Sequence, residues 1–236
     1  MISQQQRASF VAQLKPSRPQ LSIGTLTGDM MHQANDIALL EQKGIPLLHV
    51  DVMDGQAWPK ITVGSPFVAG LKTSLLKDIH LLVDQPENHI SDFANAGADI
   101  ITFALEHSRD VAKTLQLIEQ SENSNDPNRP ILRSVSIYPN TDFEQLTAHL
   151  DNLDVVFVLS VSPTTGKECF FDTVQKRVKQ LRELKPELLI AIDGGVKVSN
   201  ISEIAAIAPD FIVTGSAVFD GKDPAANIDA MESALA

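Results

Sequence analysis

The segment VVFVLSV at residues 155–161, followed by FFDTVQKRVKQLREL at 170–184, decides the fold class of this chain. The first stretch is almost continuously apolar, which is typical of a strand that is buried on both faces of a parallel sheet. The second stretch has apolar residues at three- and four-residue spacing, the pattern of an amphipathic helix. A buried strand followed by a helix that can cover it predicts one unit of an α/β protein.

The same alternation continues along the chain in both directions. Helical patterns such as DVAKTLQLIEQ at 110–120 separate short apolar runs. Eight strand–helix units in a chain of 236 residues predict a single (β/α)₈ TIM barrel rather than an open sheet. The strands are expected at 21–26, 46–52, 78–83, 99–103, 131–136, 154–160, 187–192 and 210–214.

We expect one barrel domain over residues 1–236, with an N-terminal extension at 1–20. Residues 3–14 of the extension have a helical pattern and are expected to cover the bottom of the barrel. The polar stretch SENSNDPNRP at 121–130 is expected to form a loop at the same bottom face, without a catalytic role.

Composition excludes several classes of protein. A formal net charge of −11 argues against nucleic acid or an anionic membrane as a partner. The single cysteine, Cys169, excludes an intrachain disulfide and suits a reducing compartment. The N-terminus lacks the pattern of a signal peptide, and no apolar run approaches the roughly 18 residues of a spanning helix. We therefore expect a cytoplasmic protein.

Four side chains of types that commonly bind metal ions lie at the ends of expected strands. They are His49 and Asp51 in LLHVDVMDG, His80 in KDIHLLV and Asp193 in LLIAIDGG. Active sites of such barrels lie at the carboxyl ends of the strands, and residues two apart on a strand share a face. Each residue alone could be a structural hydrogen-bonding group or a helix cap, but the four together predict a site for zinc, iron, manganese or cobalt.

Two glycine-containing loops follow the last two expected strands, IDGG at 192–195 and TGSAVF at 214–219. Loops in these two places commonly bind phosphate in such barrels. Either loop alone could be a tight turn, but the pair favours a phosphate site. Its expected contacts are backbone amides and one hydroxyl, from Gly194, Gly195, Gly215 and Ser216, with Gly166 in SPTTGKEC as a further amide.

The motifs HVDVMDG, DIHLLV, DGGVKVSNISEIA and VTGSAVF strongly resemble the ribulose-phosphate 3-epimerase family, and the resemblance runs from about residue 21 to the C-terminus. It implies a (β/α)₈ barrel of the ribulose-phosphate-binding type. It also implies an isomerase that interconverts D-ribulose 5-phosphate and D-xylulose 5-phosphate. In this family the reaction is a proton exchange between two carboxylates through a cis-enediolate.

Carried over to this chain, the resemblance implies that His49, Asp51, His80 and Asp193 hold one divalent metal ion. Zn²⁺ is favoured, with Fe²⁺, Mn²⁺ and Co²⁺ as alternatives. Asp51 and Asp193 would serve as acid and base on opposite faces of a phosphorylated ketose. Met53 would line the substrate site.

Other positions depart from the family pattern. The serine expected on the first strand falls at Gly24, although Ser22 is close, and a histidine expected after the fourth strand is Ala104. Two of three expected methionines are Leu82 and Leu159. Two glycines are missing from the strand-six loop, and the usual aromatic and asparagine after the second strand give way to Ala57-Trp58-Pro59-Lys60.

These departures leave alternatives open. The chain could be a 3-epimerase of another ketose phosphate, such as a hexulose 6-phosphate, or a barrel that binds a phosphosugar without turnover. Decarboxylase or aldolase chemistry ranks low, because related enzymes have a lysine in Asp-x-Lys-x-x-Asp, and residues 51–54 have none. The sequence also leaves a homo-oligomer open.

Overall fold

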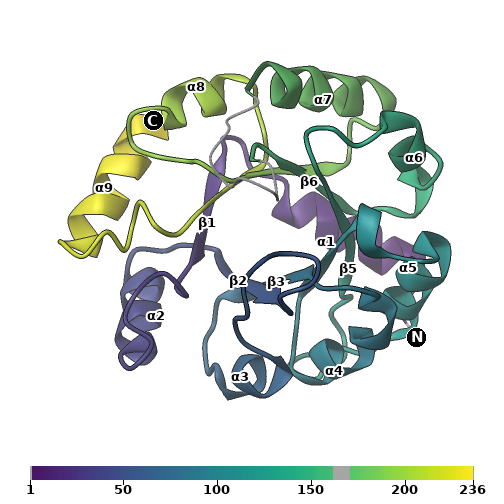
Figure 1. Ribbon diagram of the computed structural model, residues 1–236, viewed down its shortest axis with the longest axis horizontal. Coiled ribbons are helices and arrows are strands. Elements are labelled where there is room, and N and C mark those ends of the chain that lie inside the picture. Colours follow the sequence, from purple (N-terminus) through teal and green to yellow (C-terminus); the bar gives the residue numbers. More distant parts are fainter. Residues whose placement is uncertain (1, 162–170, 236) are drawn as a thin grey trace.

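A closed barrel of eight parallel strands forms the centre of the molecule. The computed structural model describes residues 2–161 and 171–235 (Figure 1). Each strand pairs with its neighbours in chain order and the last pairs with the first, which confirms the (β/α)₈ barrel. The strands are β1 Gln20–Gly24, β2 Leu47–Met53, β3 Leu76–Leu82, β4 Ile100–Ala104, β5 Leu132–Ile137, β6 Val155–Leu159, β7 Leu189–Asp193 and β8 Phe211–Thr214. No expected strand boundary differs from these by more than two residues.

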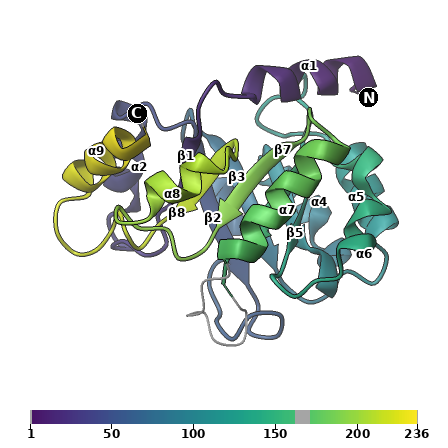
Figure 2. The ribbon, with the colours of Figure 1, turned by 90° about the horizontal axis from the view of Figure 1, so that it is seen from above.

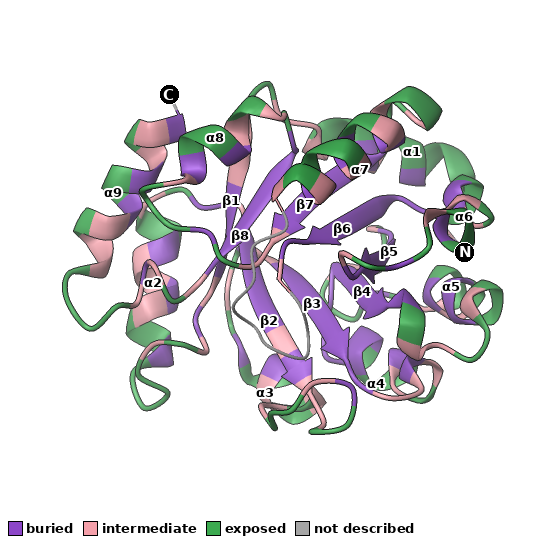
Figure 3. Ribbon diagram, turned by 45° about the horizontal axis from the view of Figure 1, so that its top comes forward, coloured by how far each residue is buried: buried purple, intermediate pink, exposed green. Residues whose placement is uncertain are grey.

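Helices surround the barrel and connect its strands (Figure 1). Their exposed faces point to solvent, whereas the strands are buried along most of their length (Figure 3). None in the described ranges is long and apolar enough to cross a membrane. The α-helices are α1 Gln4–Leu14, α2 Gln33–Gln42, α3 Ser65–Gly70, α4 Ile90–Asn95, α5 Val111–Gln120, α6 Phe143–Thr147, α7 Phe171–Leu184, α8 Ile201–Ala206 and α9 Pro224–Leu235, and the short 3₁₀ helices are η1 Pro86–Asn88, η2 Leu105–His107 and η3 Leu150–Asn152.

Strand β2 shows how the sequence sorts its side chains between the two faces of the barrel wall. Leu48, Val50 and Val52 belong to the large apolar core in which the helices pack. Leu47 belongs to a second cluster, at the amino-terminal end of the barrel interior. Because side chains alternate along a strand, His49 and Asp51 share the interior face with Leu47. The core therefore fixes which way the two polar residues point.

Helix α1 lies at one end of the barrel (Figure 2). Its Val11 packs in the interior cluster with Leu47 and other residues near the amino-terminal ends of the strands. Buried Arg7 donates hydrogen bonds to the carbonyl oxygen of Ile131 at 2.6 Å and to Oδ2 of Asp154 at 2.9 Å. The extension therefore covers the end of the barrel opposite the expected site.

The segment 121–130 is a loop at this same end, as expected. Asn123 is buried, and its Nδ2 donates to Oδ1 of Asp99 at 2.7 Å and to the carbonyl oxygen of Ala98 at 3.1 Å. These two residues immediately precede β4. The side-chain amide thus attaches the loop to the amino-terminal end of that strand.

Candidate active site

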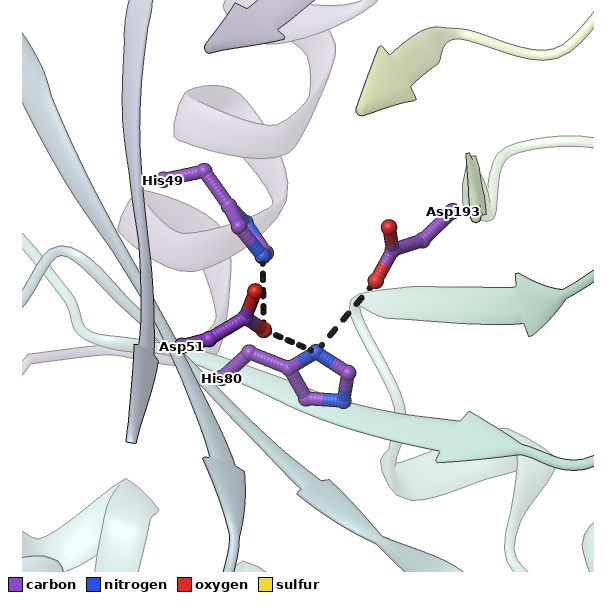
Figure 4. A group of neighbouring side chains, drawn as sticks. All are labelled: His49, Asp51, His80 and Asp193. Atoms are coloured by element: carbon purple, nitrogen blue, oxygen red, sulfur yellow. Dashed lines mark hydrogen bonds and ion pairs between the residues drawn. The ribbon is translucent and has the colours of Figure 1, made fainter. Parts of the chain in front are cut away.

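The four predicted metal-type side chains come together at the carboxyl ends of β2, β3 and β7 (Figure 4). Nε2 of His49 lies 3.2 Å from Oδ1 of Asp51. Nδ1 of His80 lies 3.3 Å from the same oxygen and 3.4 Å from Oδ2 of Asp193. One ligand atom from each residue lies within 4.8 Å of every other. The convergence predicted from the strand ends is confirmed.

Strand register produces this convergence. In the parallel pairing of β2 with β3, His49 is opposite Asp78 and Asp51 is opposite His80. Residues two apart on a strand share a face, so His49 and Asp51 on β2 point to one face, and so do Asp78 and His80 on β3. This face is the barrel interior. Asp193 is the last residue of β7 and approaches from the other side of His80 (Figure 4).

A second layer of polar side chains supports the two imidazoles. Nδ1 of His49 lies 2.7 Å from Oδ2 of Asp78, which also accepts a hydrogen bond of 3.0 Å from the Ser22 hydroxyl. Nε2 of His80 lies 2.9 Å from the hydroxyl oxygen of Ser136. Such outer partners fix the ring orientation of histidine ligands. The sequence analysis missed Asp78 and Ser136, although the Asp-x-His spacing in DIHLLV was a signal for the first.

An aromatic ring lies against both histidines from the barrel interior. The Phe157 ring centroid is 6.0 Å from that of His49 and 5.7 Å from that of His80. Phe157 is almost fully buried and belongs to the interior cluster covered by α1. The polar cluster therefore rests on an apolar layer that excludes water from below.

Burial and neighbouring charges act in opposite directions on these groups. Burial lowers the pKa of His49, but the carboxylates of Asp78 and Asp51 outweigh it, so that pKa is raised well above 6.5. Burial likewise lowers the pKa of His80, and its contacts with Asp193 and Asp51 raise it overall. Burial raises the pKa of Asp51, but the two histidines hold it far below the usual range. Without another cation, the cluster attracts protons to its imidazoles.

The donor set suits a divalent metal ion. Two imidazole nitrogens and two carboxylates form a mixed nitrogen–oxygen set of the kind that binds zinc and related ions. Nδ1 of His80 is fully buried and makes no hydrogen bond of acceptable geometry with the described residues, although two carboxylate oxygens are near it. A buried polar atom without a partner is costly. A cation between these groups would remove that cost.

The cluster forms part of the wall of a cavity of about 260 Å³. The cavity is also lined by the loops after β7 and β8, including Gly194, Gly195, Gly215 and Ser216, and by Met53. The predicted contact at Gly166 lies outside the described residues. Five of the positions that depart from the family pattern line the same cavity: Gly24, Trp58, Lys60, Leu82 and Leu159.

An apolar group forms the upper part of the barrel interior. Leu82, Ala104, Tyr138 and Leu159 cluster there, and Met53 and Trp58 pack against them. Burial and the nearby charge of Glu106 raise the pKa of Tyr138, so its phenol stays neutral. Sequence reasoning did not single out Tyr138, which packs beside Ala104, the position where the family pattern has histidine.

Close backbone approach explains the glycine after β8. A Cβ atom added at Gly215 would lie 2.9 Å from the carbonyl oxygen of Gly24 and 3.2 Å from the hydroxyl oxygen of Thr27. Gly194 and Gly195 both have positive φ, at 104° and 63°. Residues with side chains rarely adopt such φ values. These glycines let the loops after β7 and β8 bring backbone groups to the cavity.

Comparison with known proteins gives relatives over most of the chain. Residues 20–219 match the ribulose-phosphate 3-epimerase family. The ribulose-phosphate 3-epimerase of Escherichia coli strain K12 is 35% identical over 218 residues, which cover 89% of this chain and 93% of that protein. The enzyme of the same name from Bacillus subtilis strain 168 is 31% identical over 205 residues, covering 84% of this chain and 91% of that one.

Solved structures with the same fold are more distant in sequence. A structure of KGPDC from Streptococcus mutans has a TM-score of 0.70 at 17% identity, covering 92% of this chain and 97% of its own. The 3-hexulose-6-phosphate synthase of Salmonella typhimurium has a TM-score of 0.64 at 15% identity, with 92% and 98% covered. At these identities the likeness shows the barrel fold. The family match and the two bacterial relatives show more: the chain belongs to the ribulose-phosphate 3-epimerase family and is an isomerase of the epimerase class.

Proposed function

We propose that the protein is a metal-dependent 3-epimerase that interconverts D-ribulose 5-phosphate and D-xylulose 5-phosphate. The observation that carries the proposal is the placement of two carboxylates from different strands, Asp51 of β2 and Asp193 of β7, which approach Nδ1 of His80 from different directions at 3.3 and 3.4 Å (Figure 4). Inversion at a carbon requires one group to remove a proton and another to return one to the opposite face. Two carboxylates on two sides of one site meet that requirement.

His49, Asp51, His80 and Asp193 would hold the metal ion, with Zn²⁺ favoured by the donor set. When bound, the ion supplies positive charge that stabilises the negative charge developing on the substrate oxygens. Asp51 and Asp193 then divide the proton transfers at C3. One removes the proton to give a cis-enediolate, and the other protonates the opposite face.

The loops after β7 and β8 would hold the phosphate of the substrate. Gly194, Gly195 and Gly215 offer backbone amides and Ser216 offers a hydroxyl, all at the cavity that contains the cluster. Met53 would contact the sugar. Binding energy at the phosphate positions C3 between the two carboxylates.

A hexulose 6-phosphate is the second candidate substrate, and the cavity wall favours keeping it. At Gly24 an added Cβ would meet only ordinary contacts, the nearest 3.7 Å away at the carbonyl oxygen of His49. The chain therefore leaves space where the family pattern has a serine. A longer ketose phosphate could use that space.

Steady-state epimerase assays test the proposal directly. We expect turnover of D-ribulose 5-phosphate with added Zn²⁺ and its loss after treatment with a chelator. Faster turnover of a hexulose 6-phosphate would favour the second candidate. Tight binding of both sugars without turnover under any metal would instead identify a non-catalytic phosphosugar-binding barrel.

Replacing either carboxylate provides the first prediction. Asp51→Asn and Asp193→Asn should each lower the epimerisation rate beyond the roughly 10²–10⁴-fold that follows loss of a general base, because each also weakens the metal site. A matched control is Asp229→Asn, which changes an exposed carboxylate paired with Lys43 and should leave the rate unchanged.

Exchange of the C3 proton with deuterated solvent separates the two roles. A variant that lacks only the returning acid can still introduce deuterium into recovered substrate, whereas a variant that lacks the first base cannot. Starting from the other epimer should reverse which variant retains exchange. Near wild-type turnover in both metal-loaded variants would refute the two-carboxylate mechanism.

A further inference from the structure

The two histidines of the cluster have chemically different outer partners. Nδ1 of His49 faces the carboxylate of Asp78, which can only accept a hydrogen bond. When the His49 ring is neutral, its hydrogen is therefore held on Nδ1, and Nε2 presents a lone pair to the cluster. Nε2 of His80 faces the hydroxyl of Ser136, which can either accept or donate.

Within the described ranges, the hydroxyl of Ser136 contacts the histidine cluster and not a neighbouring strand. It lies on β5, is fully buried and shares the interior face of that strand with Leu132 and Ser134. The Ser134 hydroxyl oxygen accepts a hydrogen bond of 2.9 Å from Thr102, which is another strand residue. Ser136 instead contacts His80 across the barrel interior, because its own strand β5 does not pair with β3, the strand of His80.

We infer that Ser136 is a positioning residue that controls which nitrogen of His80 carries the ring hydrogen. The inference rests on the proposed metal site. When Nε2–H donates to the Ser136 oxygen, Nδ1 presents a lone pair toward Asp51 and Asp193 and can act as a ligand. In the other neutral tautomer the hydrogen lies on Nδ1, and the Ser136 hydroxyl then donates to Nε2.

A hydroxyl therefore suits either neutral tautomer of His80, whereas the carboxylate of Asp78 suits only the His49 tautomer with its hydrogen on Nδ1. Loss of the hydroxyl leaves Nε2 of His80 buried without a partner. A buried polar atom without a partner is costly, and most costly as an N–H donor in apolar surroundings. The ring hydrogen should then stay on Nδ1 and compete with the metal. Loss of such outer partners typically lowers metal affinity by about 10–100-fold.

Competition with a chromophoric chelator, with Zn²⁺ alone as the probe, tests the inference. Ser136→Ala should weaken Zn²⁺ binding by about 10–100-fold. Ser134→Ala is the matched control, because it removes an equally buried hydroxyl from the same strand face without touching a histidine. The Zn²⁺ affinity of Ser134→Ala should stay within about twofold of wild type. A change of that size is much smaller than the loss expected for an outer partner.

A pair of equal-sized variants covers the case in which Ser136→Ala does not fold. Ser136→Thr keeps the hydroxyl and Ser136→Val has nearly the same shape without it, so the threonine variant should bind Zn²⁺ more tightly. The ¹⁵N shifts of His80 give a second readout. They should show the hydrogen on Nε2 in zinc-loaded wild type and, at a pH high enough for the ring to be neutral, on Nδ1 in metal-free Ser136→Ala.

The outcomes separate the inference from the proposed function. Wild-type protein that fails to bind Zn²⁺ or the alternative ions would overturn the metal site itself. Wild-type binding with equal affinity in Ser136→Ala, or in the threonine and valine variants, would overturn only the role of Ser136. An equal loss in Ser134→Ala would do the same, since it would assign the effect to packing of β5.

Discussion

At the scale of single residues, His49 links the electrostatics of the site to its chemistry. Its ring is almost fully buried between Asp51 and Asp78, whose charges outweigh the effect of burial and raise its pKa. In the metal-free protein the His49 ring is therefore the positively charged imidazolium at neutral pH. A metal ion must displace that proton, because only the neutral ring can be a ligand.

This proton competition predicts pH-dependent metal binding. The pKa of His49 is raised above 6.5, so Zn²⁺ affinity should be low below pH 6.5 and should increase until pH exceeds the folded-state pKa. Titration calorimetry in two buffers of different ionisation enthalpy should show proton release. Asp78→Asn removes the largest charge that raises this pKa, so it should release fewer protons at about pH 7. Affinity that does not change between acidic and alkaline buffers would contradict the assignment.

The same shift has an opposite consequence for the stability of the metal-free protein. A folded-state pKa above the unfolded value means that the His49 ion pairs stabilise the fold fully below about pH 6.5. That contribution is lost as pH increases through the folded-state pKa. The His49 contribution therefore favours the metal-free fold at mildly acidic pH, where metal binding is disfavoured.

At the scale of secondary-structure elements, the ends of β7 and β8 contribute to different parts of the proposed site. Strand β7 ends at Asp193 in the cluster, and the next two residues are glycines with positive φ. Strand β8 continues into Gly215, whose backbone packs close to Gly24. One loop thus joins Asp193, the proposed acid/base residue, to the proposed phosphate site, and the other completes that site.

A negative charge placed in the loop after β8 tests the proposed phosphate site. Ser216→Asp puts a negative side chain beside the proposed phosphate, whereas Ser216→Asn has almost the same shape without the charge. The aspartate variant should bind inorganic phosphate at least tenfold more weakly than the asparagine variant, a penalty of about 1.4 kcal/mol. Ser216 is a cleaner test position than Gly215, where any side chain would also collide with Gly24. Equal phosphate affinity in both variants would place the phosphate elsewhere.

At the scale of the whole molecule, the cluster joins distant parts of the barrel wall. Its members come from β2, β3 and β7, so a metal ion would connect opposite regions of the closed sheet. The unfolded chain does not hold these side chains together. Metal binding should therefore stabilise the folded barrel by mass action.

The expected stabilisation is large enough to measure by thermal unfolding. Free Zn²⁺ at about 100 times its dissociation constant should add about 2.7 kcal/mol. For a protein of this size that corresponds to roughly 5–10 °C in Tm. His80→Ala should lose most of this increase, because the variant lacks one of the four proposed ligands. An equal increase in wild type and His80→Ala would show that zinc binds elsewhere.

Sequence alone predicted the barrel and the four converging residues because both follow from local patterns. Alternating apolar strands and amphipathic helices define the units, and strand ends locate the site. The outer partners could not be predicted in this way. Asp78 meets His49 through the register of two strands, and Ser136 meets His80 across the barrel interior. Such contacts depend on shear and closure, which no single segment encodes.

The proposed metal site can form only when β2 and β3 pair in the correct register. A slip of one residue would turn His49 and Asp51 outward into the apolar core beneath the helices and bring Leu48 and Val50 inside. A misaligned chain would then have no site for the ion. During folding, the ion should therefore be retained only by correctly aligned molecules, so metal retention would report on the accuracy of the barrel as well as on its chemistry.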